Sequence, residues 1–529
     1  MGQIAGVSGK GYSQFERPAS WLRATHERRL NRNGCSMAAH CDDDELHEGG
    51  GVMVALSGIC LQAGKKITAR DIADQYRRDG TLDTSRFDGH FAIGLYDDVA
   101  DRLLLCRDAI GITPLYYAAS PTELFFASEC KLLLMQHGID RSLDAGAMQR
   151  FLDDGWTPAH RTFFQSIRPV PPGYLLVREA SGTIRMHRQT PWEASHEAVA
   201  ASPRDITRAL EESVAALFGA KTDQRVGIML SGGIDSALIG GTLRQRLPEA
   251  QIHSFTVGYG EDDPEIIGAR ATAAALNFTH HDVFVSPGDL DRLLPAAILA
   301  METLGGHDEY PCLFAAHEAA AGKVDILFSG NMSDTLFAGM DSHRAIWRDC
   351  YPIGGRHGTG TGGRILSAAL QKALLARDER LSAQERFAQR FDMKALMPFT
   401  ASRLITLALS IPDDQKLDES RNKIILRQAA AQILPREIAE RPKGIQQLRY
   451  DSAMIEWLVG RLGAIQRERP GPIGAVLNAD CIGDAIHELS VSAARPAVHR
   501  AWNLCALDAW YRAFAHELPV RPEAVGAVQ

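Results

Sequence analysis

The sequence predicts an α/β protein in which a β-rich amino-terminal part precedes a doubly wound parallel sheet and a helical carboxyl-terminal region. Short β-rich runs separated by acidic or glycine turns, such as residues 91–98 and 102–108, fill the first half. Strand and helix patterns then alternate between about residues 206 and 339, which is typical of a parallel sheet with helices on both faces. Beyond about His343 the pattern is mainly helical.

The composition is that of a soluble globular protein. The 529 residues are 45% hydrophobic and 23% charged, and the net charge of -8 argues against a nucleic-acid partner. No secretory signal is apparent and no apolar run is long enough to span a bilayer, so we expect a cytoplasmic protein without a membrane partner. The nine cysteines form no CxxC pair, which predicts neither a disulfide framework nor a zinc site.

The pattern divides the chain into two parts. We expect one domain over residues 1–190 and a second over 200–529, with a polar, alanine-rich linker at 187–205 between them. In the second domain the strand patterns cover 225–230, 252–258, 280–285 and 324–330, and the helix patterns cover 206–219, 236–247, 263–277 and 289–302. The glycine-rich stretch at 354–363 is typical of a mobile loop.

The turn after the first of these strands has the composition of an anion-binding loop. The sequence SGGIDS at 231–236 matches neither the Walker A loop nor the GxGxxG motif. Its paired glycines allow close backbone approach, and its hydroxyls and helix-start amides can bind phosphate. A carboxylate beside bound phosphate is repulsive unless a cation lies between them, so Asp235 predicts Mg²⁺.

Several ordered segments resemble the asparagine synthetase family. The 231–236 loop looks like the pyrophosphate loop of ATP-pyrophosphatase-type enzymes, and 327–339 stands where the family carries an SGEGxDE-like stretch. Residues 255–283 and 397–444 are similar to the segments that follow the family's second strand and form its helical region. Residues 88–120 look like the family's glutaminase-type domain. The resemblance implies an Ntn-hydrolase-like β-sandwich followed by an ATP-pyrophosphatase domain.

The resemblance also implies a set of site residues. Asp235 and Asp334 would hold Mg²⁺, Lys443 would stabilise charge on an acyl-adenylate, and Lys423 is either a phosphate-side cation or a helix-end residue. Asn331 replaces the catalytic glutamate of SGEGxDE and cannot accept a proton. The positions implied to bind ATP are Leu230, Ser231, Gly232, Gly233, Asp235, Ser236, Val257, Ser329, Gly330 and Lys423. Alternative bases are His307, Asp308 and Glu309.

The amino-terminal domain departs from glutamine-dependent members of the family. Gly2 stands where those members carry a nucleophilic cysteine, and their RGPD-like and NGEIYN-like segments are not recognisable. Cys35 and Cys41 are the remaining candidates for a thiol nucleophile. We therefore expect an inactive glutaminase domain with a structural role. Relatives of this kind include β-lactam synthetases and lasso-peptide cyclases, which close a ring onto an amine.

These observations predict an AMP-forming carbon–nitrogen ligase that uses ATP and Mg²⁺. It would adenylate a carboxylate and join it to an amine of a small-molecule or peptide substrate, in an intramolecular reaction of specialised metabolism such as antibiotic biosynthesis. The alternatives are a lasso-peptide macrocyclase, an ammonia-dependent asparagine synthetase, and a binding protein that has kept the fold without catalysis. The resemblance is also compatible with a homodimer.

Overall fold

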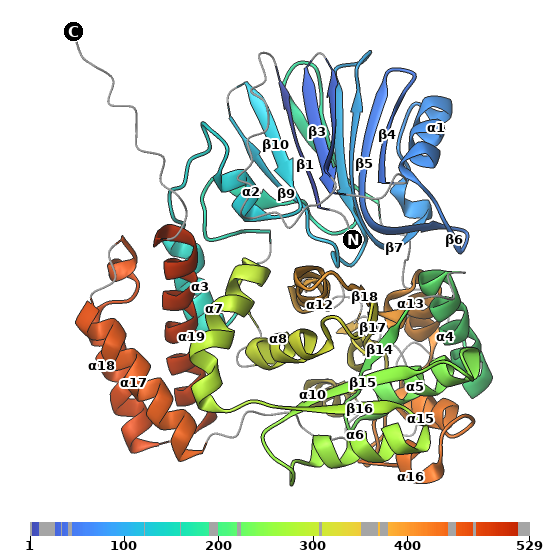
Figure 1. The fold of residues 1–529 in the computed structure, drawn as a ribbon, viewed down its shortest axis with the longest axis vertical. Coiled ribbons are helices and arrows are strands. Elements are labelled where there is room, and N and C mark those ends of the chain that lie inside the picture. Colours follow the sequence, from blue (N-terminus) through green and yellow to red (C-terminus); the bar gives the residue numbers. More distant parts are fainter. Residues whose placement is uncertain are drawn as a thin grey trace.

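A computed structural model describes most of the chain, and two layers of strands lie above a parallel sheet and its helices (Figure 1). The described residues are 3–9, 27–32, 34–40, 45–120, 122–158, 160–189, 199–219, 224–305, 309–350, 369–370, 379–442, 451–468, 472–492 and 494–516. The predicted glycine-rich loop at 354–363 lies outside them.

The amino-terminal part is a sandwich of two antiparallel sheets. The first sheet has the order β11-β9-β10-β1-β3-β2, with bounds β1 Ile4–Gly9, β2 Glu27–Arg32, β3 Cys35–His40, β9 Tyr116–Ala119, β10 Glu123–Ala127 and β11 Ile167–Pro169. The second has the order β13-β12-β8-β7-β5-β4, with β6 beside β5, and the bounds β4 Leu46–Gly49, β5 Val52–Gln62, β6 Lys65–Lys66, β7 Phe87–Asp97, β8 Arg102–Arg107, β12 Tyr174–Arg178 and β13 Ile184–Arg188. Buried side chains such as Met37, Ala55, Leu105 and Phe126 fill the space between the two sheets.

Helix α1 (Ala69–Asp79) covers the outer face of the second sheet. A capping box fixes its start, because Thr68 accepts from the backbone N–H of Asp71 and the Asp71 carboxylate accepts from that of Thr68. The helix buries Ile72 and Tyr76 against the sheet.

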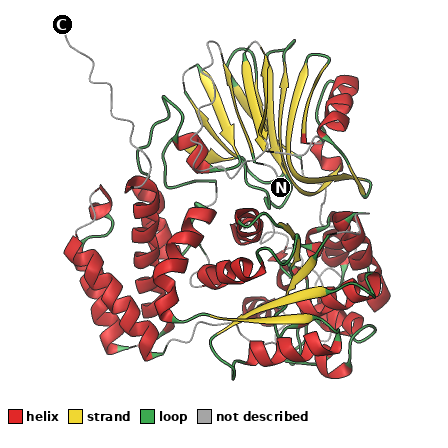
Figure 2. Ribbon diagram, in the orientation of Figure 1, coloured by secondary structure: helices red, strands yellow, loops and turns green. Residues whose placement is uncertain are grey.

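The second part contains a parallel sheet of order β16-β15-β14-β17-β18 (Figure 2). Its strands are β14 Val226–Met229, β15 Ile252–Gly258, β16 Thr279–Phe284, β17 Ile326–Phe328 and β18 Lys394–Leu396. Ile326 and Phe328 pack in the core that holds α4 (Pro203–Phe218) and α5 (Ile234–Arg246), whereas Leu327 packs on the opposite face. Helices on both faces confirm the predicted fold class.

Four further helices complete the layers around this sheet. Helix α6 (Pro264–Ala275) lies against β15 and β16, while α8 (Glu309–Ala320) covers β15 from the other face. Helix α12 (Glu379–Arg390) contacts β18, and α7 (Leu290–Met301) packs on α8 and α12. The sequence pattern missed β18 because its three residues are too few to show a period.

The remaining helices confirm a mainly helical carboxyl-terminal region, in which α17, α18 and α19 pack on one another. Their bounds, with those of two helices of the first part, are α2 Cys130–Leu134, α3 Ala145–Asp154, α9 Ser333–Leu336, α10 Asp341–Cys350, α13 Ser402–Ser410, α14 Asp413–Lys416, α15 Ile424–Ala430, α16 Arg436–Ala439, α17 Ser452–Glu468, α18 Ala479–Val491 and α19 Arg495–Tyr511. Short 3₁₀ turns lie at Thr84–Arg86, Pro287–Asp289, Pro398–Thr400 and Pro472–Ala475, and a π-helical turn lies at Arg512–His516. Among the described helices, none is long and apolar enough to cross a membrane.

The predicted linker at 187–205 is shorter than expected. Strand β13 extends to Arg188 because it pairs with β12 along its whole length, and α4 already begins at Pro203. A capping box between Ser202 and Asp205 fixes that start. The segment between these two elements lies partly outside the described residues.

The two parts share buried hydrophobic clusters. Val7 and Phe125 of the first sheet belong to the same buried cluster as Leu294 of α7 and Trp510 of α19. Ile59 and Ile110 of the amino-terminal part belong to a second buried cluster, which also holds Ile326 and Phe328 of the parallel sheet. The amino-terminal part therefore packs both against the helices that flank the sheet and against the core on one face of the sheet.

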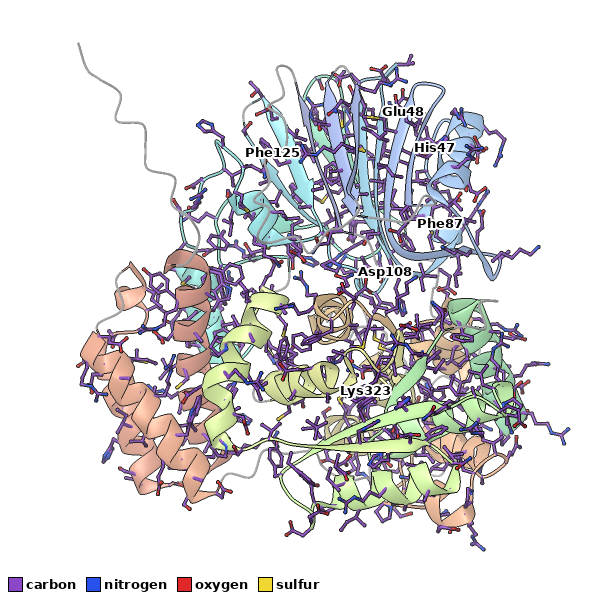
Figure 3. The ribbon with its side chains drawn as sticks, viewed as in Figure 1. His47, Glu48, Phe87, Asp108, Phe125 and Lys323 are labelled. Atoms are coloured by element: carbon purple, nitrogen blue, oxygen red, sulfur yellow. The ribbon has the colours of Figure 1, made fainter. Side chains whose placement is uncertain are left out.

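A buried carboxyl group lies where the sandwich meets α12. Glu385 is fully buried and accepts a hydrogen bond from Thr113 Oγ1 at 3.0 Å. Burial, and then the charge of Asp108 at the edge of the sandwich (Figure 3), raise the pKa of Glu385 to about 8. The folded protein therefore binds a proton at Glu385 that the unfolded chain has already released above pH 4.5.

We expect Glu385→Gln to flatten the dependence of stability on pH. Because the folded pKa is raised, wild-type stability falls as pH rises from 4.5 to about 8, by up to about 5 kcal/mol. The introduced amide keeps the contact with Thr113 but does not ionise, so the variant should melt above the wild type at pH 9. Thermal midpoints from pH 5 to 9 measure this, with the exposed Glu249→Gln as control. Equal pH slopes for Glu385→Gln and wild type would contradict the assignment.

Candidate active site

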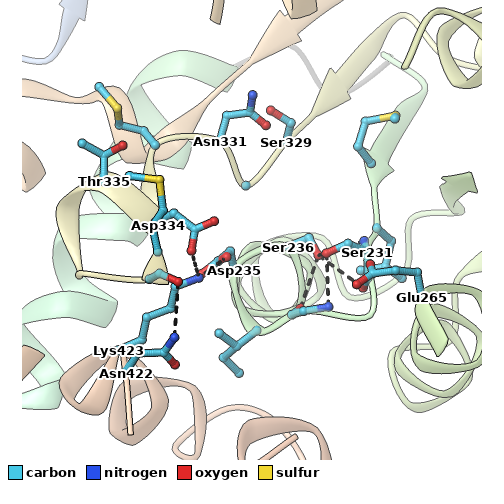
Figure 4. Close-up of a pocket in the computed structure, with 18 of the residues that line it drawn as sticks. Ser231, Asp235, Ser236, Glu265, Ser329, Asn331, Asp334, Thr335, Asn422 and Lys423 are labelled. Atoms are coloured by element: carbon cyan, nitrogen blue, oxygen red, sulfur yellow. Dashed lines mark hydrogen bonds and ion pairs between the residues drawn. The ribbon is translucent and has the colours of Figure 1, made fainter. Parts of the chain in front are cut away.

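A pocket of about 1140 Å³ opens at the carboxyl ends of β14, β15 and β17. Parallel α/β sheets hold their ligands at this edge. Most positions predicted to bind ATP or to act in catalysis line it, namely Leu230, Ser231, Gly233, Asp235, Ser236, Val257, Ser329, Gly330, Asn331, Asp334 and Lys423. Figure 4 shows Asp235, Asp334 and Lys423 converging on one side of the pocket and Ser231, Ser236 and Glu265 on the other.

The glycine loop is held by its own hydroxyls. The backbone N–H of Ser231 donates to Ser236 Oγ at 3.0 Å, and that of Gly233 donates to Ser231 Oγ at 3.1 Å. Gly233 is the N-cap of α5 and has no side chain to occupy the first amides of the helix. The positive end of α5 therefore faces the pocket, as an anion site requires.

Glu265 supports the loop from behind. Its carboxylate accepts from the backbone N–H of Gly232 at 2.9 Å, and the residue also lines the pocket. The backbone of Gly232 therefore helps to anchor the loop. Arg441 clamps the same turn, because its Nη1 donates to the carbonyls of Gly232 at 3.1 Å and Gly268 at 2.7 Å.

Gly330 lets the two loops of the site touch through their backbones. A Cβ at this position would lie 2.9 Å from the backbone nitrogen of Ser236 and 3.1 Å from the carbonyl carbon of Asp235. Because those atoms belong to the main chain, neither could move aside cheaply. The glycine of the predicted SGNMSD stretch thus brings Asp334 close to the loop that carries Asp235.

Lys423 joins the two predicted metal carboxylates. Its Nζ lies 2.5 Å from Asp235 Oδ2 and 2.6 Å from Asp334 Oδ1, and Ser333 Oγ donates to Asp235 Oδ1 at 2.7 Å. The lysine side chain is 2% exposed. Burial works against its charge, but the Asp235 and Asp334 carboxylates hold the pKa of Lys423 above its usual value. The ammonium therefore stays charged at neutral pH.

Oxygen donors suited to Mg²⁺ converge at this point. Both carboxylates lie within 2.6 Å of one nitrogen atom, so their oxygens could share one cation. Mg²⁺ in phosphate-transferring sites commonly takes one or two carboxylates and completes its shell with phosphate and water. The described residues include no group of three or more His, Cys, Asp or Glu placed to hold a metal. Two carboxylates beside an anion-binding loop match the ligands that Mg²⁺ takes in such sites.

Two carboxamides also line the pocket. Gln384 Nε2 of α12 donates to Asn331 Oδ1 at 3.4 Å, and both residues line the pocket. Neither amide can accept a proton as a base. Met332, the next residue, has a φ of 81°, a left-handed conformation that a side-chain-bearing residue rarely adopts. Glu309 lines the pocket, whereas His307 and Asp308 lie outside the described residues.

Lys443 also lies outside the described residues, but the segment that leads to it is anchored at the site. Arg427 Nη1 donates to the carbonyl oxygens of Ala439 at 3.0 Å and Arg441 at 2.7 Å. Pro442 lines the pocket. The role of Lys443 stays a prediction.

Three residues of the site were missed by sequence reasoning. Ser333, Gln384 and Arg441 contact Asp235, Asn331 and the glycine loop through side chains that no motif marks. Arg441 lies within the segment that resembles the family's helical region, but arginine in such a segment is not specific. Gln384 had no signal in the sequence.

The cysteines described in the sandwich are unsuited to nucleophilic catalysis. Burial raises the pKa of each thiol above its usual value, which disfavours the thiolate that would attack a substrate. These residues are Cys35, Cys60, Cys106 and Cys130. The structure therefore argues against Cys35 as a substitute nucleophile, while Cys41 and Gly2 lie outside the described residues.

Comparison with known proteins places the chain in a family. The family model for asparagine synthase matches residues 205–380 and 363–512, more than half of the chain, and the model for a glutamine amidotransferase domain matches 69–190. Glutamine-hydrolyzing asparagine synthetase 1 of Bacillus subtilis (strain 168) is 28% identical over 273 residues, which cover 51% of this chain and 42% of the relative. Glutamine-hydrolyzing asparagine synthetase of Sandersonia aurantiaca is 26% identical over 377 residues, covering 68% and 63%. The chain thus spans less than two thirds of either relative. It belongs to the asparagine synthetase family.

Proposed function

We propose that the chain is an AMP-forming amide ligase that activates a substrate carboxylate with ATP and joins it to an amine. The observation that carries the proposal is the cluster of Asp235, Lys423 and Asp334 beside the amides of the glycine loop. Fixed charges of both signs next to an anion-binding helix start suit a nucleotide whose phosphate chain is cleaved. Membership of the asparagine synthetase family supports the same reaction class.

In the proposed reaction a carboxylate oxygen attacks the α-phosphorus of ATP. The bond from that phosphorus to the bridging oxygen breaks, and pyrophosphate leaves. The amine nitrogen then attacks the acyl carbon, AMP leaves with the acyl-bound oxygen, and the nitrogen loses a proton. Ser231, Ser236 and the first amides of α5 would hold the phosphates, and Lys443 would stabilise the oxyanion. Asp235 and Asp334 would hold Mg²⁺, which neutralises phosphate charge when bound.

We also propose that the nitrogen comes from an amine of the substrate rather than from glutamine. The buried thiols of the sandwich and the amide pair of Asn331 and Gln384 favour this. Because neither of these amides can act as a base, an amine held close to the acyl group gains most from proximity. Glu309, which lines the pocket, stays a candidate base. The substrate would then be a small molecule or peptide that carries both groups and forms a lactam or macrolactam. Ammonia-dependent asparagine synthesis and a noncatalytic role are the alternatives.

Exchange of labelled pyrophosphate into ATP tests the first half-reaction. Each of the twenty amino acids, and short peptides with free carboxylates, would be offered with Mg²⁺. We expect Asp235→Asn to lower exchange at least about 100-fold with any carboxylate that supports it, because the variant loses one cation-binding charge. Asp480→Asn, on the exposed start of α18, is the matched control and should exchange at the wild-type rate. Full exchange by Asp235→Asn would remove the role given to this carboxylate.

The nitrogen source has its own test. With a carboxylate that supports exchange, we expect AMP to form without any glutamate being released from added glutamine. Released glutamate is measured by chromatography, and ammonium chloride replaces glutamine in a parallel reaction. Glutamate formed in step with AMP would overturn the proposed amine source, while AMP formation would still support the ligase. Asparagine formed from aspartate and ammonium would favour the ammonia-dependent alternative.

A further inference from the structure

Helix α12 contacts two different parts of the molecule with its two sides. Leu381 and Gln384, three residues apart, lie on one face and line the pocket. Arg386, which lies roughly opposite Gln384 on the helix, reaches Tyr116 in the amino-terminal domain, and Glu385, which follows Gln384 in the chain, reaches Thr113. Residues 381–388 are all buried, so the helix cannot shift without changing both sets of contacts.

The contacts with the amino-terminal domain are polar and enclosed. Thr113 Oγ1 donates to Glu385 Oε1 at 3.0 Å, and Arg386 Nη2 donates to Tyr116 Oη at 2.7 Å. Arg386 Nη1 also donates to Glu302 Oε2 at 2.8 Å. Hydrogen bonds in such a low-dielectric setting restrict geometry strongly, because each unpaired group would be costly. They fix both the rotation and the height of α12 against the sandwich.

Gln384 connects α12 to the loop that carries Asn331. Gln384 is 4% exposed and reaches Asn331 at 3.4 Å. Asn331 stands between Gly330, whose backbone touches the glycine loop, and Met332, which holds a left-handed φ of 81°. A residue in this conformation persists only where its surroundings hold it. The amide of Gln384 contributes to holding it, because it contacts the preceding residue, Asn331.

We propose that Gln384 is a positioning residue whose place is set by the amino-terminal domain through Glu385 and Arg386. The domain then does more than pack on its neighbour, since it orders the loop that carries Asn331 and Asp334. The inference rests on the proposed function only in treating the pocket as the active site. It requires no particular carboxylate or amine.

Hydrogen–deuterium exchange followed by mass spectrometry tests the proposal on the full chain without substrate. The double variant Thr113→Val, Tyr116→Phe removes two hydroxyls that hold α12 and keeps the side-chain shapes. We expect exchange in residues 329–336 to rise about fivefold to tenfold, while exchange in α18, which packs on α17 and α19, stays unchanged. Tyr76→Phe is the matched control, because it removes a 2.9 Å hydrogen bond to Asp97 in the same domain away from α12.

A second variant distinguishes a positioning role of Gln384 from a general loosening of the fold. In Gln384→Leu the link to Asn331 is already absent, so exchange in 329–336 should be raised, and adding Thr113→Val and Tyr116→Phe should raise it no further. Three results would overturn the proposal. They are an equal rise in Tyr76→Phe, a rise confined to the sandwich and α12, and full additivity in the triple variant. If the wild type exchanged no pyrophosphate with any carboxylate, the proposed function would be wrong. The hydrogen–deuterium exchange results would still decide whether Gln384 positions the loop.

Discussion

Replacing Lys423 by methionine is expected to lower pyrophosphate exchange at least about 1000-fold and to leave two carboxylates facing each other. Methionine keeps much of the length and packing of lysine but carries no charge. Asp235 and Asp334 both lie within 2.6 Å of the missing nitrogen, so their repulsion would no longer be offset. Removing one partner from a buried charge cluster costs about 3 kcal/mol. The cost is smaller here because the carboxylates of Asp235 and Asp334 stay partly exposed to solvent.

The same variant makes a prediction that needs no substrate. If the two carboxylates are able to hold a divalent cation, Lys423→Met should bind Mg²⁺ more tightly than the wild type, because the competing ammonium is gone. Thermal midpoints with increasing Mg²⁺ should then rise more in the variant. Lys323→Met, an exposed lysine near the end of α8, is the control and should follow the wild type. An unchanged response to Mg²⁺ in Lys423→Met would refute the shared cation site.

The local parts of the site could be read from the sequence because they lie within one strand–turn–helix unit. The apolar run that ends at Leu230, the two glycines and the small residues of α5 all fall within one short segment. Periodicity therefore placed the loop at the sheet edge, and topology placed 329–334 beside it. The resemblance to a family identified Asp334 as the partner of Asp235.

The pairings across the chain could not be read in the same way. Lys423 lies 188 residues after Asp235, and Gln384 lies 53 residues after Asn331. Whether such side chains meet depends on how the helices are placed by tertiary packing. Hydrophobic periodicity along the sequence does not predict that placement. Lys423 itself has a φ of 55° just before α15, a local conformation that the sequence does not predict. Lys423 thus places a fixed positive charge between Asp235 and Asp334.

The largest loss of stability is expected from Glu302→Ala, at the junction of the two parts. The Glu302 carboxylate is 0% exposed and lies 2.8 Å from Arg386 Nη1 and 3.2 Å from Lys131 Nζ. It also accepts from the backbone N–H groups of Cys130 and Lys131 at the start of α2. Burial works against its charge, but Lys131 and Arg386 hold the pKa of Glu302 below its usual value.

Alanine at this position would leave the guanidinium of Arg386 buried without its carboxylate. We expect the free energy of unfolding at pH 7 to fall by about 3–5 kcal/mol, measured as the urea midpoint followed by tryptophan fluorescence. Lys131 would keep its contact with Glu129 at 2.5 Å, so Arg386 carries most of the loss. Glu302→Ala combined with Arg386→Met should be less destabilised than the sum of the two single variants, because no unpaired charge is left.

The pH dependence distinguishes lost charge from lost packing. Since the folded pKa of Glu302 is depressed, its contribution is present above the usual pKa of 4.5 and is lost as pH falls through the folded value. The gap in stability between wild type and Glu302→Gln, which keeps the shape, should therefore be widest above pH 4.5 and should narrow progressively as the pH falls below it. A gap that does not narrow below pH 4.5 would mean that the charge of the carboxylate does not stabilise the fold. In that case the two parts of the molecule would be held by their shared hydrophobic clusters, with no help from the ions between them.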